Sequence, residues 1–398
     1  MFILSSQNYG FDNPGNGQEE QFGKNHLLSS EQRNKFITIS MQSRLIIIVV
    51  TLLKASFCFA FPEIASKPNC TACHYSPTGG GVLTQYGRES IKELLSHWGK
   101  EGESDFAYGV VQTPKFLSLG GDIRFLQTYH NNQFIQKADY YFMQADLDAA
   151  IKLGNNIVVV STLGIDALKE IISRQHYILH SVSEHMLVRL GRFFPAFGIN
   201  TPDHAITIKK NVGFDHSQET YNLELAWTYD NINAYVTGIF GRPDKPWLAR
   251  ETGGTVNINF LVFEKYKLGL SYYYGTQANT STHLYGPYGI FRLTQKIVWL
   301  TELDFQKRFS NTLTPQFGLV NYQKLDYEIT QGLHLYLTQA LSRLDFSVPT
   351  SLFDAYGAGI QFFPRPHWVL QGEFLKQRTL GLTKSFSDFA WLLIHFYF

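Results

Sequence analysis

The chain is poor in cysteine, in charge and in long apolar runs. Its 398 residues include 3 Cys and 4 Met, and 17% of them are charged. So few thiols suit an oxidising compartment, where stray thiols pair. No apolar run reaches the length of about eighteen residues that a membrane-spanning helix needs, which excludes that kind of membrane anchor. A formal net charge of +1 argues against a nucleic-acid partner.

Aromatic residues and glycine are abundant instead. The chain holds 32 Phe, 22 Tyr, 6 Trp and 32 Gly. An exported chain with this composition is typical of outer-membrane β-barrels, in which only alternate residues of each strand face lipid.

An export signal is present, but it does not begin at the first residue. A short basic segment follows Met41, an apolar core covers Leu45–Leu53, and Cys58-Phe59-Ala60 has the small-x-small pattern of a cleavage site. We predict a signal peptide over residues 41–60 and a mature chain that begins at Phe61. Residues 1–40 are polar and aperiodic, which predicts a disordered leader or an untranslated stretch. A lipoprotein anchor at Cys58 is disfavoured by the bulky residue before it.

The sequence Cys70-Thr71-Ala72-Cys73-His74 is a C-x-x-C-H motif, the attachment motif of c-type haem. Two thiols on one turn add to the haem vinyl groups, and the adjacent imidazole is the proximal ligand of the iron. With this composition, the motif is expected by chance roughly once in a thousand such chains. We therefore predict one covalent haem c held by Cys70 and Cys73, with His74 on the iron.

Three other interpretations of the motif are weaker. A structural zinc site needs about four ligands, and the only other cysteine lies in the predicted signal peptide. A thioredoxin-like pair requires a βαβ context, whereas the flanking sequences indicate turns. A disulfide between Cys70 and Cys73 leaves His74 without a role.

Residues 61–115 are predicted to form a small helical domain around the haem. Ile91, Leu94, Leu95 and Trp98 recur with helical spacing. So short a segment buries little surface, and an apolar haem supplies much of the missing interior.

Residues 116–398 alternate between apolar and polar positions in segments of about ten residues. Turn sequences such as Asp230-Asn231 and Glu264-Lys265 separate them. This pattern predicts an all-β fold, a transmembrane antiparallel β-barrel of about 14–16 strands in the cell outer membrane. The last strand has one apolar face and ends on an aromatic residue, as bacterial outer-membrane barrels do. Its apolar face consists of Ala390, Leu392, Ile394, Phe396 and Phe398. A soluble β-sandwich or propeller is the alternative.

A haem motif followed by a barrel resembles the fused cytochrome-porins of the outer membrane, which include iron oxidases. Besides Cys70, Cys73 and His74, the segment Leu83–Arg88 is similar to the L-T-x-F-G-R of that family. The resemblance implies electron transfer across the outer membrane, from an extracellular donor such as Fe(II) to a periplasmic cytochrome or other carrier. The mature N-terminal domain is then expected to enter the barrel as a plug. The alternatives are a transport pore with a haem-bearing plug and a haem enzyme with an open iron position.

The sixth iron ligand is left open by the sequence. No Met lies between Phe61 and Gly120, and His97 is the local candidate for the distal ligand. A histidine near a helix C-terminus is also favoured there by the helix dipole alone. Histidines of the barrel are further candidates, namely His176, His180, His185 and His395. Arg88 is either a partner of a haem propionate or a solvated helix residue.

Overall fold

The computed structural model describes residues 70–398 except 101, 133, 167–169, 203–205, 215–217, 247–249, 312–313 and 383. The predicted leader (1–40), the signal peptide (41–60) and the first residues of the haem domain (61–69) lie outside the described residues. No helix among the described residues is long and apolar enough to cross a membrane.

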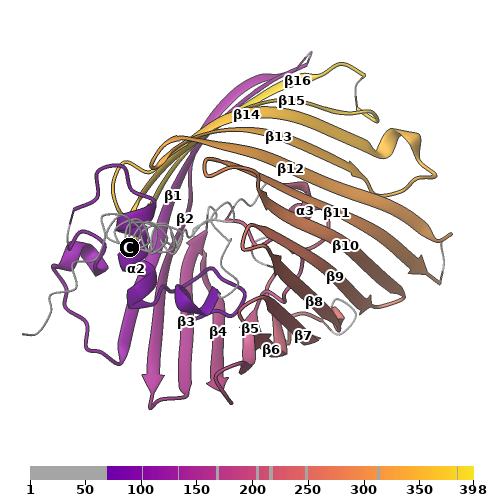
Figure 1. The fold of residues 1–398 in the computed structure, drawn as a ribbon. Helices are drawn as coiled ribbons and strands as arrows, with labels where there is room; N and C mark the ends of the chain where they lie inside the picture. Colours follow the sequence, from indigo (N-terminus) through magenta and orange to yellow (C-terminus); the bar gives the residue numbers. More distant parts are fainter. Residues whose placement is uncertain are drawn as a thin grey trace, which may run out of the picture. The chain divides into compact units, whose positions relative to one another are not determined.

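Sixteen antiparallel strands form a closed barrel (Figure 1). Each strand pairs with its neighbours in sequence, and β1 closes the ring by pairing with β16. The strands are β1 (Leu117–Asn131), β2 (Gln136–Leu153), β3 (Ile157–Asp166), β4 (Ile171–Ser181), β5 (Met186–Phe193), β6 (Thr220–Thr228), β7 (Ile232–Gly241), β8 (Thr252–Val262), β9 (Tyr266–Gln277), β10 (Thr280–Arg292), β11 (Ile297–Ser310), β12 (Gln316–Thr330), β13 (Leu333–Arg343), β14 (Leu352–Phe362), β15 (Trp368–Thr379) and β16 (Ser387–Tyr397). The predicted barrel class and strand number are confirmed.

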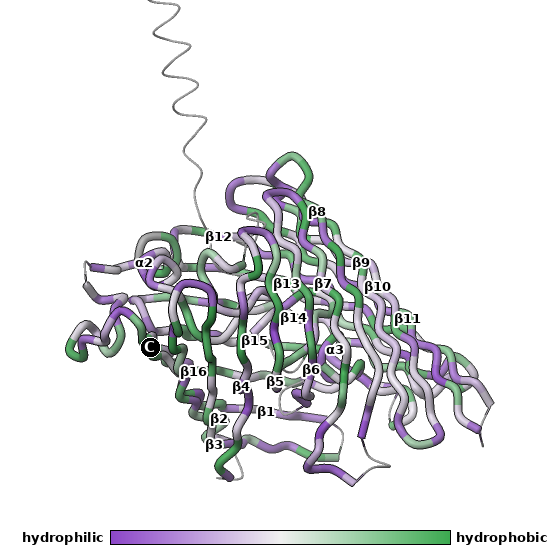
Figure 2. The backbone as a smooth tube through the Cα atoms, turned by 90° about the horizontal axis from the view of Figure 1, so that it is seen from below, coloured by the Kyte–Doolittle hydropathy of each residue, from purple (hydrophilic) through white to green (hydrophobic). Residues whose placement is uncertain are grey.

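The strands alternate between a polar interior and an apolar exterior. In β13, Tyr336 and Thr338 are buried, whereas Leu335 and Leu337 are exposed on the outer face. Figure 2 shows the same alternation of hydrophobic and hydrophilic positions along the strands. Leucine side chains on the outer face are unfavourable in water and favourable in lipid. In a membrane barrel the alternate residues that point outward face the bilayer, which explains this pattern.

The two mouths of the barrel differ in their connections. After even-numbered strands the connections are short turns, including 229–231 and 263–265, so both predicted hairpins are confirmed. The longest connections, 194–219 and 242–251, follow odd-numbered strands. We call the two ends the short-turn mouth and the long-loop mouth. Short turns face the periplasm in outer-membrane barrels, which assigns the short-turn mouth to that side.

The described residues before β1, 70–115, form a segment that we call the plug. It contains the 3-10 turns η2 (Cys70–Ala72) and η3 (Phe106–Gly109) and the helix α2 (Gln85–Leu94). Thr84 caps α2, since its side chain accepts a hydrogen bond from the backbone of Gly87.

The helix ends earlier than the spacing of its apolar residues predicts. Ile91 and Leu95 are buried as expected, but Trp98 lies outside α2. The backbone N–H groups of His97 and Trp98 donate instead to the carbonyls of Phe363 (2.8 Å) and Pro364 (2.9 Å) in the turn between β14 and β15. Hydrogen bonds to the barrel thus replace those that would continue the helix.

A second segment enters the ring from the long-loop side. This inward loop, residues 194–219, carries the short helix α3 (Thr207–Lys210), which lies within the ring of strands in Figure 1. Its backbone N–H at Ile199 donates to the buried Glu302 carboxylate (2.6 Å), and the Thr207 hydroxyl donates to the carbonyl of Asn321 (2.9 Å). The loop is therefore fixed to β11 and β12 rather than extended away from the barrel.

Candidate cofactor site in the barrel lumen

The first part of the plug is hydrogen-bonded to inward-facing residues of several strands. The Tyr75 hydroxyl lies 2.8 Å from that of Ser118 on β1. Arg189 of β5 donates to the hydroxyl of Ser76 (3.0 Å). The buried hydroxyl of Tyr235 on β7 donates to the carbonyl of Pro77 (2.9 Å). These bonds hold the residues that follow the haem motif against the lumen wall.

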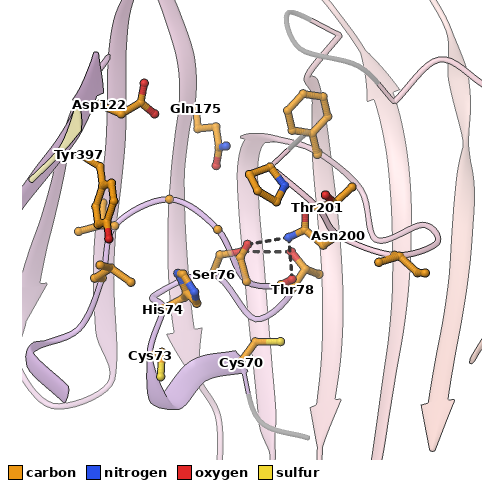
Figure 3. A pocket seen from close by; sticks show the side chains of 18 of the residues that line it. Cys70, Cys73, His74, Ser76, Thr78, Asp122, Gln175, Asn200, Thr201 and Tyr397 are labelled. Atoms are coloured by element: carbon orange, nitrogen blue, oxygen red, sulfur yellow. Dashed lines mark hydrogen bonds between the residues drawn. The ribbon is translucent and has the colours of Figure 1, made fainter. Parts of the chain in front are cut away.

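The plug also meets the inward loop. The Asn200 amide donates to the carbonyls of Thr78 (2.9 Å) and Gly79 (3.1 Å), as the dashed lines in Figure 3 show. Gly79, Gly80 and Gly81 all have positive φ, between 64° and 83°. Such angles favour glycine and let the chain turn back sharply after the motif.

The end of the plug binds the short-turn mouth. Gln331, in the turn between β12 and β13, donates to the carbonyl of Ser96 (3.0 Å). Arg365 pairs with Glu103 at 2.8 Å, and the indole of Trp368 donates to the hydroxyl of Tyr108 (2.8 Å).

Between the plug, the inward loop and the strands lies a cavity of about 510 Å³. Its volume is within the range of about 300–1,000 Å³ that is usual for ligand and cofactor sites. Cys70, Cys73 and His74 all line it. Figure 3 shows them together with Tyr397 of β16 and Asn200 of the inward loop, and a Cβ at Gly79 would lie within 4 Å of both Asn200 and the sulfur of Cys70.

The local backbone explains how the motif presents its three side chains. The N–H groups of Cys73 (3.2 Å) and His74 (2.9 Å) both donate to the carbonyl of Cys70, which closes a tight turn. His74 then pairs with Leu83 in an isolated antiparallel bridge. Cys70 and Cys73 are half-buried and are not joined by a disulfide.

The His74 side chain is half-buried in the cavity wall, and its Nδ1 atom is fully buried. Its Nδ1 has no hydrogen-bond partner among the described residues. Burial lowers the pKa of His74 to about 4, against the opposing effect of the backbone at Gly81 and Gly80. The ring is therefore neutral at physiological pH, which is the form that binds metals.

These residues fit a c-type haem. The group requires two thiols on one turn, a neutral imidazole with an unpaired nitrogen and a cavity with apolar surface, and the lining here combines a larger apolar part with polar and charged residues. The walls also carry Arg124, Arg174 and Arg189, each paired with a carboxylate of the barrel. Among the described residues no cluster of three or more His, Cys, Asp or Glu could hold a bare metal ion.

The lumen around the cavity is strongly charged but internally paired. Arg189 and Glu224 lie 2.7 Å apart, with side chains 2% and 0% exposed. Arg174 and Asp146 lie 2.5 Å apart and are also buried. The guanidinium of Arg189 additionally packs 3.8 Å from the ring centre of Phe193. Arg189 thus connects the plug to a buried ion pair of the barrel wall.

The histidines predicted as candidate sixth ligands have different surroundings. His97 is at the short-turn mouth, where its Nδ1 lies 2.8 Å from the carbonyl of Gln331, and it does not line the cavity. Both ring nitrogens of His176 have hydroxyl partners. His180 is exposed, and His185 stacks on Tyr229. His395 lines the cavity.

Arg88 is not a solvated helix residue, because it is only 8% exposed. Burial lowers its pKa, while Tyr75, Asp105 and Asp148 nearby raise it. It lies beside Gly120 at the start of the barrel and does not line the cavity.

Sequence reasoning missed the residues that position the motif. Arg189, Tyr235 and Asn200 were not singled out, although the first two occupy inward positions of predicted strands. A polar side chain at an inward position of an alternating strand indicates a lumen contact, but not its partner. Asn200 had no such indication, because it lies in a loop.

Gly87 of α2 packs directly against the haem motif. A Cβ at this position would lie 2.2 Å from the carbonyl oxygen of Cys73. We expect Gly87→Ala to displace α2 from the motif at a cost of about 1–3 kcal/mol. Limited proteolysis should then cut the plug several times faster. Glu89→Ala, on the exposed face of the same helix, is the control and should leave the rate unchanged; equal rates for both variants would contradict this packing.

His367 connects the plug to the short-turn mouth. It is 3% exposed, and its ring contacts that of Tyr108 at 4.8 Å. Burial lowers its pKa, as does Arg88, while nearby backbone groups raise it. When the plug leaves the short-turn mouth, the His367 imidazole is exposed and binds a proton more readily than when the plug covers it. Binding of the plug to this mouth should therefore be strongest above the ordinary histidine pKa of 6.5 and weaken as pH falls below it.

Proteolysis of the plug at neutral pH and at about pH 5 measures this effect. We expect faster cleavage at the lower pH in the wild type and a smaller difference in His367→Phe, which keeps the aromatic contact. The same pH difference in both proteins would contradict a contribution from His367.

A closed antiparallel barrel with an apolar exterior and a polar, charged lumen defines the class of outer-membrane β-barrels. The predicted location, the cell outer membrane in contact with its lipid, agrees with this fold.

Solved structures of that class share the fold. A loop-deletion mutant of OmpT of Vibrio cholerae superposes with a TM-score of 0.58 at 8% identity, covering 71% of this chain and 99% of that one. OprB of Pseudomonas putida gives 0.56 at 11% identity, with 71% and 94% covered. The anion-selective porin from Comamonas acidovorans gives 0.53 at 12% identity, with 71% and 99% covered. The chain matches no protein-family model and no curated protein.

Proposed function

We propose that this chain is an electron-transfer protein of the outer membrane, with one c-type haem held inside the lumen of its barrel. One observation carries the proposal: Cys70, Cys73 and His74 line a single cavity between the plug and the barrel wall. When bound, a c-type haem takes up and gives up one electron at its iron. An extracellular one-electron reductant would supply the electron, and a periplasmic cytochrome or similar carrier would receive it.

The chain's own residues have distinct tasks in this proposal. Cys70 and Cys73 would hold the porphyrin, and His74 would bind the iron in its neutral form. Arg189 and Asn200 fix the loop that follows the motif. The barrel supplies an insulating band about 25 Å tall, so a single redox centre can serve both sides only from within the lumen.

Vesicles test the proposal directly. The full-length protein, matured with haem, is reconstituted into vesicles that enclose an oxidised soluble cytochrome, and a membrane-impermeant reductant is added outside. We expect the enclosed cytochrome to be reduced in vesicles with the wild type and to remain oxidised with a Cys70→Ser/Cys73→Ser variant. Equal rates with both proteins would overturn electron transfer. Oxidation of Fe(II) stays a prediction, to be tested with Fe(II) as the external reductant.

The second candidate function is a transport pore that the plug closes, and the comparisons with solved structures favour it. The similar structures include an anion-selective porin and an outer-membrane channel, and a barrel of sixteen strands is wide enough for an aqueous channel. The same vesicles, filled with a small dye, separate the two functions. Rapid dye release without reduction of an enclosed cytochrome too large to escape supports the pore; reduction in vesicles that retain the dye supports electron transfer.

A further inference from the structure

We propose that His395 of β16 would bind the haem iron as its sixth ligand, in addition to His74. The inference rests on the proposed function, since it requires a haem at Cys70 and Cys73. It assigns the distal ligand to the barrel wall and not to the plug, where His97 was the local candidate.

The position of His395 along its strand is the first argument. His395 and Tyr397 both line the cavity from the inward face of β16. Tyr397 packs against the same apolar cluster as Leu83, the bridge partner of His74. Figure 3 shows Tyr397 and His74 among the side chains that line the cavity. Two residues along a strand advance about 7 Å, so His395 lies one step deeper on the same wall.

The chemistry of the imidazole is the second argument. Its side chain is 15% exposed, and its Nε2 has no hydrogen-bond partner among the described residues. Asp122 lies 3.9 Å from that nitrogen, but its carboxylate already accepts hydrogen bonds from Gln144 (2.9 Å) and Arg124 (3.3 Å). A buried polar atom without a hydrogen-bond partner costs folding free energy, which indicates that this nitrogen binds another group.

The lack of competing ligands is the third argument. Among the described residues, His74 and His395 are the imidazoles that line the cavity, and none of its lining residues is a methionine. His97 is bound to Gln331 at the short-turn mouth, and His176 is bound through both nitrogens. His395 is thus the one described imidazole besides His74 that faces the cavity with an unpaired nitrogen.

Spectroscopy of the full-length, haem-loaded protein tests the assignment. In the wild type, two imidazoles should give a low-spin ferric spectrum in absorption and paramagnetic resonance, and the ferrous protein should not bind carbon monoxide. His395→Ala should convert the ferric iron to high spin and allow stoichiometric binding of carbon monoxide, and added imidazole should restore the low-spin state. His97→Ala, the matched control, should behave as the wild type.

His395→Met covers the case in which the alanine variant does not fold. It should remain low-spin but raise the reduction potential, because a Met/His pair favours the reduced iron. A His395→Ala protein that stays low-spin, or a His395→Met protein with unchanged potential and spectrum, would overturn the assignment. Haem staining on a denaturing gel separates the two hypotheses: covalent haem with unchanged variant spectra rejects His395 alone, whereas no covalent haem in the wild type rejects the proposed function and this assignment with it.

Discussion

Cys70→Ser/Cys73→Ser is expected to abolish covalent haem attachment and leave the barrel folded. Serine hydroxyls do not add to vinyl groups, whereas the two thiols of the motif would form the thioether bonds of the proposed haem. The contacts that fix the plug involve Tyr75, Ser76 and residues further along the chain, so they do not depend on either sulfur. Haem staining after denaturing electrophoresis measures attachment, and the heat-dependent migration of the same band reports the barrel.

Thr71→Ala is the matched control for this experiment. It changes a residue between the cysteines but preserves the C-x-x-C-H pattern, so haem staining should equal that of the wild type. Single replacements of Cys70 or Cys73 should leave one thioether and an intermediate yield. Covalent haem in the double variant would show that the motif is not the attachment site.

Arg189→Met is expected to destabilise the protein by about 3–5 kcal/mol, the usual cost of leaving one partner of a buried ion pair without the other. Glu224 is 0% exposed and would lose its cationic partner, keeping the hydrogen bond from the Thr237 hydroxyl. The variant also removes the donor to Ser76, so the plug should loosen together with the barrel wall. Urea unfolding in lipid vesicles measures the first effect, and proteolysis of the plug the second.

Two further variants interpret that result. Arg189→Met/Glu224→Leu removes both charges and should recover much of the lost stability, because no charge is left unpaired. Arg242→Met disrupts the pair with Asp244, whose side chain is 52% exposed, and should cost no more than about 1 kcal/mol. An effect of Arg189→Met no larger than that of Arg242→Met would contradict a buried, unscreened pair.

The barrel could be predicted from the sequence because its pattern is local. Alternation in segments such as Leu333–Arg343 reflects the two faces of a strand, and glycine or asparagine between segments marks the turns. The hairpins around Asp230 and Glu264 were predicted correctly for this reason. The end of α2 was not, because the hydrogen bonds that stop it come from Phe363 and Pro364, far away in sequence.

In the candidate site, too, features that depend on neighbouring residues could be predicted and features that depend on distant residues could not. Cys70, Cys73 and His74 could be predicted as one site because haem attachment would need them within one turn. The inward loop, the partners Arg189 and Asn200, and the difference between His97 and His395 were beyond sequence reasoning. Each depends on which residues face one another across the lumen. Strand alternation shows whether a residue points into the lumen or outward, but not which residue lies opposite it.

By itself, the sequence determined the barrel and the number of its strands within narrow limits, and it predicted the chemistry of its cysteine motif. These follow from residue types at fixed short spacings, where bond geometry and the two-residue period of a strand leave few choices. Only the tertiary structure decided where the motif lies and which imidazole shares its cavity. Closing β1 onto β16 makes one cavity that both His395, near the end of the chain, and His74, near its described beginning, line. No local spacing records that arrangement, because ring closure alone creates it.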